Sequence, residues 1–402
     1  MALYPEQLKD IPNNIVSIYQ ELEDFILKDF ARRIKKAGII TDTAQWQALK
    51  AKEIGISINS IKKETERITG LSVEELDKLF NDAALVSLNN DNKIYKMAGL
   101  TPLKIENNPY LKKIIKSAIK QTNEELFNLT QSLGFSETIG GKTVYKSIAK
   151  YYHDALDFAQ FQILSGVTDY NTAIKNTIKK LSNSGLKYVN YESGWANRLD
   201  VAVRRATLTG SNQMAQKMTI IGIEESGCEY IETSAHAGAR PSHAIWQGQV
   251  FSWKGKSNKY PNFEESTGYG RGDGLGGWNC RHSFFPFYPG ISSRSYTDEQ
   301  LKSIDPPNIE YNGIEYTHYE ATQRQRKLET LMRKTKRELM MFKETGLDEE
   351  FKISSIKLNR QKEYYKDFSR VAGLKVQNDR HQVLGYDKSI SQKAVWAAKN
   401  NK

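Results

Sequence analysis

The sequence predicts a mostly α-helical α+β protein, with helical regions at both ends and a small central domain that contains a few strands. Apolar residues recur at spacings of three and four near both ends, as they do on one face of an amphipathic helix. Short β-branched segments are confined to the middle of the chain. The 402 residues, 39% hydrophobic and 10% aromatic, suffice for two or three folded units. We expect a helical region over residues 1–216, an α+β domain over 218–315 and a basic helical tail over 316–402.

The first region is expected to be helical because its apolar residues follow the helical repeat. The clearest stripe consists of Ile15, Ile18, Tyr19, Leu22, Phe25, Ile26 and Phe30. The repeat resumes between Ile148 and Ile163 and again between Ile174 and Leu181, and Gly185 is a suitable helix C-cap. Asparagine and glycine predict turns at residues 70, 89–91, 107–109 and 140–141. No spacing in this region is typical of a catalytic site.

The residue composition and the predicted secondary structure change after Gln216. Three short segments are apolar, β-branched or aromatic and are predicted to be strands: Met218–Ile223, Tyr230–Thr233 and Val250–Trp253. The chain between and after them is rich in glycine, serine, asparagine and aromatic residues. We therefore expect a compact α+β domain with few strands and long ordered loops.

The last part of the chain carries most of the positive charge. From His318 to Lys402 there are 20 lysines and arginines against 11 acidic residues, a net charge of +9 out of +11 for the whole chain. Such a local excess favours an anionic neighbour, either nucleic acid or an acidic protein surface. An amphipathic helix is expected here, ended by Gly346 and followed by a second basic helix to Val371. Its candidate contact residues are Arg326, Arg333, Lys334 and Arg337.

Composition also limits the compartment. The two cysteines, Cys228 and Cys280, cannot form a disulfide framework and suit a reducing cytoplasm. The first residues lack the basic and apolar segments of a signal peptide. No run of about 18 apolar residues occurs, so we expect no membrane span.

Several residues of metal-binding type gather in the central domain. Thiolates and imidazoles are the usual zinc ligands, and the candidates here are Cys228, His236, His243, Cys280 and His282. Their spacing contains no CxxC or HxxxH pair, however, which weakens a zinc interpretation. We therefore expect no metal and no other cofactor. The histidines are expected instead to form hydrogen bonds with loop carbonyls.

A thiol nucleophile is the second chemical option for the same residues. Cys280 would need a lowered pKa and one of the neighbouring histidines as its base. Its aromatic surroundings, which include Trp278 and Phe284, suit a buried and inert thiol. The glycines between residues 268 and 277 lack the lysine of a phosphate-binding loop and are expected to allow close packing around Trp278. Arg240 and Arg271 are expected to pair with carboxylates or carbonyls and hold these loops.

Three segments carry a resemblance to a known family. They are SAHAGARPSHAIWQGQVFSW, GLGGWNCRHSFFPFYPG and YTHYEATQRQRKLETLMRKTKRE. Together they resemble the phage minor capsid protein 2 family, which is similar to the wider group of Mu F-like head morphogenesis proteins. The motif shared with that group would comprise Arg240, His243, Gly248 and Asn279–Arg281. The resemblance covers almost the whole chain. It implies a low-copy head protein, incorporated during procapsid assembly near the portal and the DNA, with no established catalytic activity.

We therefore expect a minor structural protein of a tailed-phage head, made in the host cytoplasm and not an enzyme. Its expected partners are the portal protein, other head proteins and, without sequence preference, genomic DNA. The residues expected to form a structural motif cluster are His236, Arg240, His243, Trp246, Gly248, Trp278, Asn279, Cys280, Arg281 and His282. Two alternatives stay open: a virion-associated zinc or thiol hydrolase that uses the histidines and Cys280, and a DNA-binding protein that leaves the particle with the genome.

Overall fold

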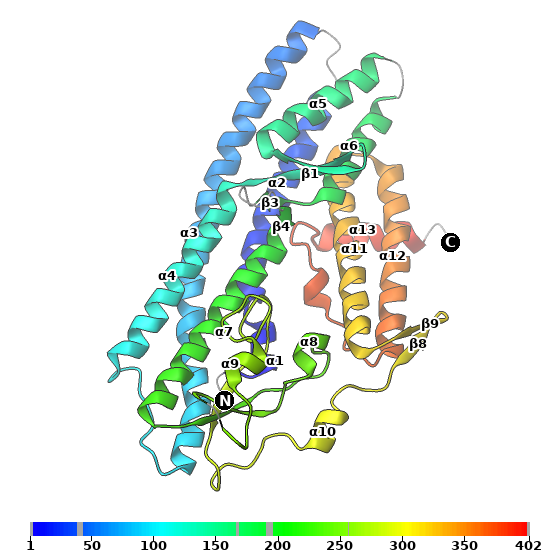
Figure 1. Ribbon diagram of the computed structural model, residues 1–402. Helices are drawn as coiled ribbons and strands as arrows, with labels where there is room; N and C mark the ends of the chain where they lie inside the picture. The colour runs from blue at the N-terminus through cyan, green and yellow to red at the C-terminus, as the bar shows by residue number, and fades with distance from the viewer. Residues whose placement is uncertain (1–2, 38–42, 166–168, 190–195, 256, 400–402) are drawn as a thin grey trace. The chain divides into compact units, whose positions relative to one another are not determined.

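The computed structural model describes residues 3–37, 43–165, 169–189, 196–255 and 257–399, and it is mostly helical with small antiparallel sheets (Figure 1). This confirms the predicted fold class. The chain forms two compact units, each assembled from separate stretches of sequence. The first unit comprises Met1–Val16, Ser72–Leu126 and Val203–Ala321, and the second comprises Ser17–Leu71, Phe127–Ala202 and Thr322–Lys402.

The first unit combines helices with a small sheet. Its helical part contains α1 (Pro5–Asp10), the end of α3 (Thr43–Met97), most of α4 (Pro109–Gln131) and most of α7 (Leu199–Glu225). A three-stranded antiparallel sheet has the order β6 (Val250–Ser252), β5 (Tyr230–Thr233) and β7 (Phe284–Phe287). The short helices α8 (Pro241–Ala244) and α9 (Phe263–Thr267) lie in its connections. After the sheet come α10 (Asp298–Lys302) and a hairpin, β8 (Ile309–Tyr311) and β9 (Ile314–Tyr316).

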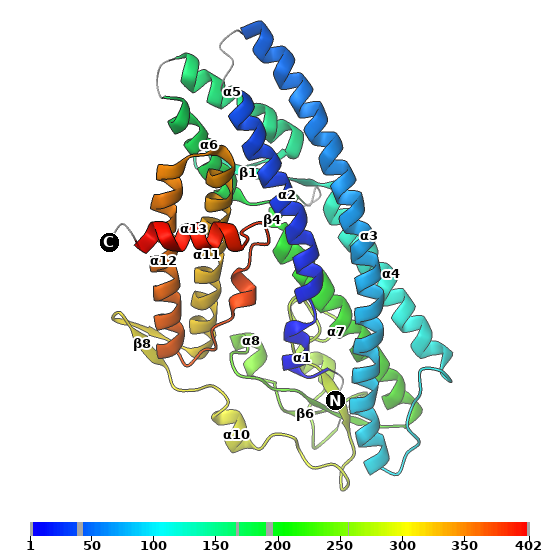
Figure 2. The same cartoon turned by 180° about the vertical axis from the view of Figure 1, so that it is seen from behind.

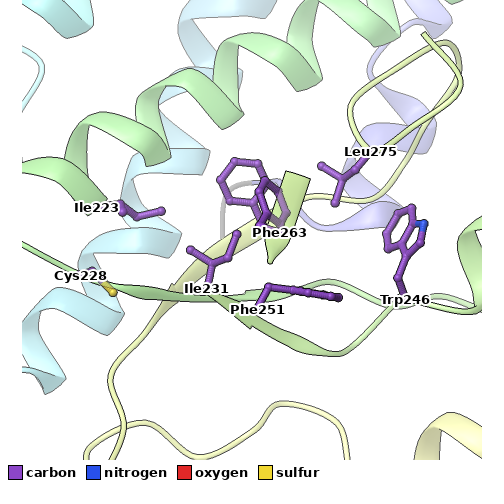
Figure 3. Packing of buried hydrophobic residues seen from close by; sticks show 8 residues of the cluster. Ile223, Cys228, Ile231, Trp246, Phe251, Phe263 and Leu275 are labelled. Atoms are coloured by element: carbon purple, nitrogen blue, oxygen red, sulfur yellow. The ribbon is translucent and has the colours of Figure 1, made fainter. Parts of the chain in front are cut away.

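A compact apolar cluster holds this sheet and its loops together. It consists of Ile223, Cys228, Ile231, Trp246, Phe251, Phe263, Leu275 and Phe284 (Figure 3). The rings of Phe263 and Phe284 meet edge to face, with their centroids 5.0 Å apart. Because the strands are only three or four residues long, burial of these side chains contributes much of what stabilises the domain.

The second unit contains a four-stranded antiparallel sheet and several helices. The strand order is β2 (Lys142–Ser147), β1 (Leu133–Ile139), β3 (Lys187–Val189) and β4 (Ala196–Arg198). The helices include most of α2 (Asn13–Ala37), together with α5 (Ile148–Leu164) and α6 (Tyr170–Ser184). Near the carboxyl terminus, α11 (His318–Thr345) and α12 (Asp348–Val371) lie side by side (Figures 1 and 2), followed by the 3-10 helix η1 (Asn378–His381) and by α13 (Lys388–Lys399).

Several predicted elements are confirmed. Strands β5 and β6 lie where β-branched and aromatic residues predicted them, and α12 follows the break at Gly346. Gly185 caps α6 with a positive φ of 62°. Asn108 starts α4, because its side-chain oxygen accepts hydrogen bonds from the backbone N–H groups of Tyr110 and Leu111.

Other predictions are wrong, and the reason is tertiary packing. Met218–Ile223 is the last part of α7 and not a strand: Met218 and Ile223 are buried on the helix, where packing outweighs β propensity. The expected turns at residues 70 and 89–91 lie inside α3. The sheet β1–β4 lies in a region that was expected to be helical.

The predicted borders at residues 216 and 316 follow the chain, whereas each compact unit combines distant stretches. The three-part division stays a prediction. Among the helices that the structure describes, none combines the length and the apolar character needed to cross a bilayer.

Candidate functional site

The histidines and one cysteine of the central motifs meet inside the first unit. His243 lies on α8, which begins with Pro241 at its first position, where the missing N–H costs nothing. Cys280 and His282 lie in the extended segment that leads into β7. These three side chains form the cluster that we call the His/Cys triad. His243 and Cys280 are each 2% exposed and His282 is 1% exposed, so the triad is buried.

The ligand-type atoms of the triad converge on a small triangle. Nδ1 of His243 lies 3.4 Å from Nδ1 of His282, and the Cys280 Sγ lies 3.7 Å from each of these nitrogens. Among the residues that the structure describes, this is the group of histidine, cysteine and acidic side chains whose atoms come close enough to share a metal ion. Sequence reasoning named the three residues among five candidates.

Hydrogen bonds on the outer sides of the two rings determine which nitrogens carry protons. Nε2 of His243 lies 2.9 Å from the backbone oxygen of Asp273, and Nε2 of His282 lies 3.1 Å from Oε1 of Gln247. The backbone N–H of His236 donates to the same Oε1, which identifies that atom as the amide oxygen. Because both partners are acceptors, each Nε2 is the donor. Each Nδ1 therefore presents a lone pair to the thiol.

Helix α7 holds the segment that carries Cys280 and His282. The buried amide of Asn212 donates to the backbone oxygens of Cys280 and His282, at 3.0 and 3.1 Å. Gln216 donates a further hydrogen bond to the His282 oxygen, at 3.2 Å. Gly276 has a φ of +74°, and a Cβ at this position would lie 2.3 Å from Oε1 of Gln216. The loop can therefore approach α7 this closely only with glycine at residue 276.

His236 and Trp246 surround the triad without adding a ligand. The His236 ring stacks on that of His282, with centroids 4.4 Å apart, and its Nδ1 lies 2.9 Å from the backbone oxygen of Ala237. Nδ1 of His236 also lies 3.2 Å from a guanidinium nitrogen of Arg281. The ring of Trp246 contacts that of His282 edge to face, with centroids 4.7 Å apart. The expectation that histidines bond loop carbonyls is confirmed for His236 and His243.

The remaining motif residues shape the loops. Arg240 donates to the backbone oxygen of Trp278 at 2.9 Å, while the Trp278 side chain itself is 62% exposed. The exposed Asn279 adopts a φ of 55° next to Cys280. At Gly248, with a φ of +67°, a Cβ would lie 2.5 Å from the side chain of Leu301. These residues hold the backbone of the loops in place, and their role as a structural motif stays a prediction.

Burial keeps the groups of the triad uncharged. Desolvation raises the pKa of the Cys280 thiol. It lowers the pKa of His243, lowers that of His282 well below its ordinary value, and lowers that of His236 to about 4. A nucleophilic thiol needs the opposite shift and an exposed position. These shifts oppose the activation that thiol catalysis requires.

Cys228 does not join the triad. Its Sγ donates to the backbone oxygen of Tyr230 at 3.1 Å, and burial raises the pKa of this thiol. Figure 3 shows Cys228 and Trp246 at opposite ends of the apolar cluster. Sequence distance could not separate the two cysteines, because the triad is formed by the tertiary approach of α8 to the segment before β7.

The basic residues predicted for anion binding divide into two groups. Arg337 is 1% exposed and forms an ion pair with the buried Glu23, and Arg333 pairs with the buried Asp200 at 3.1 Å. Both arginines were predicted as contacts for nucleic acid or an acidic partner, and in the structure they pair with internal carboxylates. Arg326 is exposed and Lys334 is half-buried, so both stay predictions.

A groove lined by residues of α11 and α12 was not predicted from the sequence. Its volume is about 520 Å³, and it is lined by Arg324, Leu328, Ile353, Ile356, Lys357, Arg360, Gln361 and Tyr364. Three of these side chains are cationic and none is acidic. The alternation of basic and apolar residues along both helices was the available signal, but it could not show that the two faces adjoin.

Comparison with known proteins identifies the chain. A family model described as Phage minor capsid protein 2 matches residues 3–369. No curated protein and no solved structure matches the chain. The match spans both the triad and α11, in agreement with the resemblance of the central motifs. The protein therefore belongs to the phage minor capsid protein 2 family and is a minor structural protein of a bacteriophage head.

Proposed function

We propose that this protein is incorporated during head assembly in the host cytoplasm and lies at the portal. We further propose that the basic groove on α11 and α12 receives an acidic segment of a neighbouring head protein there. The lining of the groove carries this proposal. Arg324, Lys357 and Arg360 supply positive charge, while apolar side chains supply surface that a partner can bury. Ile353, which is 58% exposed, is the most open of them. An interface of this kind combines apolar burial with charge complementarity.

Packaged DNA is the second candidate partner. The net charge of +9 over residues 318–402 favours it, even after Arg333 and Arg337 are assigned to internal ion pairs. Binding to DNA would depend on phosphates and would weaken steeply with salt. The apolar lining of the groove favours a protein segment over DNA as the partner, because phosphate contacts need no apolar surface.

We also propose a structural and not a hydrolytic role for the His/Cys triad. Its three side chains are at most 2% exposed, so a substrate cannot reach them without opening of the loop. The pKa of Cys280 is raised and those of both histidines are lowered, which opposes a thiolate–imidazolium pair. Hydrolysis with Cys280 as nucleophile would require both shifts to be reversed.

The first test is quantitative mass spectrometry of gradient-purified particles, both full and emptied of DNA. A low copy number that stays constant on emptying, together with cross-links to the portal protein, is expected. Loss of the protein on emptying would instead indicate ejection with DNA. Absence from purified particles would refute the proposal.

The second test reverses one groove charge. Arg360→Glu is expected to lower the number of copies incorporated per particle, because an acidic partner would then be repelled. Lys62→Glu is the matched control, since Lys62 is exposed on α3 and lies outside the groove. If DNA is the partner, Arg360→Glu should lower the salt dependence of binding to DNA by about one phosphate contact. Equal incorporation of the two variants would contradict the groove proposal.

A further inference from the structure

We propose that the His/Cys triad binds a divalent cation of the zinc class and that this ion holds the loops of the central domain in place. The ligands are Nδ1 of His243, Nδ1 of His282 and the Sγ of Cys280. The site goes beyond the head function and does not depend on which partner fills the groove.

The dimensions of the triad fit zinc. A triangle with sides of 3.4, 3.7 and 3.7 Å has a point about 2.1 Å from each corner. Zinc bonds to imidazole nitrogen measure roughly 2.0–2.1 Å and those to thiolate sulfur roughly 2.3 Å. An ion slightly out of the triangle's plane therefore reaches all three atoms at its preferred distances, without movement of any side chain.

Proton positions lead to the same conclusion. Each ring donates its Nε2–H to an acceptor, His243 to Asp273 and His282 to Gln247, so both Nδ1 lone pairs point at one place. Two lone pairs that face each other at 3.4 Å repel, whereas a cation between them is bound by both. Histidine ligands in metal sites usually donate their other N–H to a carbonyl in this way. Gln247, held by the backbone N–H of His236, is thus part of the supporting shell.

The chemistry of the ligands selects the ion. A thiolate and two imidazoles suit zinc and disfavour magnesium and calcium, which prefer oxygen ligands. Binding displaces the Cys280 proton, because the thiolate is the ligand form. In tetrahedral zinc, three protein ligands leave the fourth position to an outside ligand such as water. An open fourth position is typical of catalytic zinc sites, and the burial of all three residues is the observation that favours a structural use here.

The position of the ligands explains what the ion would stabilise. His243 lies on α8, whereas Cys280 and His282 lie 37 and 39 residues further along the chain, on the segment that enters β7. Between them are a three-residue strand, a five-residue helix and long glycine-rich loops. A metal bridge across this stretch restricts the unfolded chain and adds its binding free energy to folding.

The test uses untagged full-length protein, purified under reducing conditions without chelator. Elemental analysis is expected to find zinc equimolar with the chain, and X-ray absorption is expected to show a first shell with one sulfur and two imidazole nitrogens. Protein that retains no zinc, and binds none when zinc is added in excess, would overturn the proposal. A first shell of oxygen ligands alone would overturn it as well.

Variants assign the ligands. Cys280→Ser and His282→Asn are expected to reduce bound zinc from equimolar to background. The matched controls Cys228→Ser and His153→Asn should keep it, because neither residue belongs to the triad. Loss of zinc from the controls but not from the triad variants would refute the assignment.

Cobalt provides a second measurement in case a triad variant fails to fold. Cobalt(II) bound to the folded wild-type protein should give a thiolate-to-metal charge-transfer band and the intense visible bands of tetrahedral cobalt. Only Cys228 or Cys280 could supply the thiolate. The charge-transfer band is therefore expected to persist in Cys228→Ser, and its disappearance in that variant would contradict the proposal.

Discussion

Replacing Glu23 by glutamine should destabilise the second unit by several kcal/mol, although the change alters only one atom of the side chain. The Glu23 carboxylate accepts a hydrogen bond from Arg337, lies 3.6 Å from Arg198 and accepts the backbone N–H of Leu186 at 2.8 Å. Arg337 is 1% exposed and Glu23 is 3% exposed. Glutamine keeps the shape of the side chain but removes its charge.

The size of this loss of stability depends on which carboxylates Arg198 and Arg337 still contact in the variant. Arg198 keeps the buried Asp200, at 3.2 Å, whereas Glu23 is the carboxylate that pairs with Arg337. Glu23→Gln therefore leaves the Arg337 guanidinium buried without a countercharge in contact. Breaking a buried pair in this way costs about 3–5 kcal/mol. Burial already lowers the pKa of Arg337 and Glu23 opposes that shift, which is consistent with a large loss.

Removing the arginine of this ion pair should reduce the free energy of unfolding less than removing the carboxylate. In Arg337→Met, Glu23 retains Arg198 and the Leu186 N–H, and the methionine side chain fills part of the vacated volume. We expect a loss of about 1–3 kcal/mol, near the cost of losing one partner of a buried hydrogen bond. The double variant should be more stable than Glu23→Gln alone, because it no longer contains a buried unpaired guanidinium.

Urea unfolding followed by far-ultraviolet circular dichroism measures the free energy of unfolding of each variant. Glu21→Gln is the matched control: Glu21 lies on the same helix, its side chain is 42% exposed, and it pairs with the partly exposed Arg67. Such a surface pair contributes roughly 0–1 kcal/mol. If Glu23→Gln and Glu21→Gln destabilise the protein equally, the buried Glu23–Arg337 pair contributes no more to stability than a surface pair.

Four further substitutions test other parts of the structure. Burial raises the pKa of Asp24 to about 6. Its folded pKa thus exceeds the unfolded value, so the contribution of Asp24 to the free energy of unfolding should fall by about 2–3 kcal/mol as pH rises from 4 to 7. Asp24→Asn should remove this loss, and parallel pH curves of the variant and the wild type would contradict the expectation. Gly222→Ala should destabilise the protein by about 1–3 kcal/mol in thermal unfolding, since its Cβ would lie 2.0 Å from the Tyr95 hydroxyl. Gly70→Ala should instead stabilise the protein by about 0.5–1 kcal/mol, because the space around Gly70 is open. Gln247→Leu should weaken zinc binding about 10–100-fold in a competition titration, and unchanged affinity would exclude its supporting role.

Local patterns predicted the parts of the fold that depend on local physics. The strands β5 and β6, the cap at Gly185 and the break at Gly346 follow from side chains near each position. The end of α7 could not be predicted in this way, because Met218 and Ile223 are helical through burial against distant residues. The same holds for the pairing of β1 with β3, because Leu133 lies opposite Tyr188, which is far away in the sequence.

The site shows the same division between local and distant information. Residue types identified five possible zinc ligands. Their spacing argued against a metal, because spacing rules recognise only ligand pairs that lie on one local element. The structure brings together His243, Cys280 and His282 from separate segments and leaves Cys228 in the apolar cluster. Charge counting likewise could not separate the buried Arg337 from the groove residue Arg360, since their partners lie on other elements.

The discontinuous second unit has a consequence for synthesis of the protein on the ribosome. Glu23 is translated early, but its buried partner Arg337 follows 314 residues later. Until α11 has left the exit tunnel, Glu23 lacks its buried partner Arg337, and helices α5 and α6 lack the carboxyl-terminal part of their unit. The nascent chain must therefore remain incompletely folded for most of its translation, and premature termination before Arg337 would yield a polypeptide suited to chaperone capture or degradation.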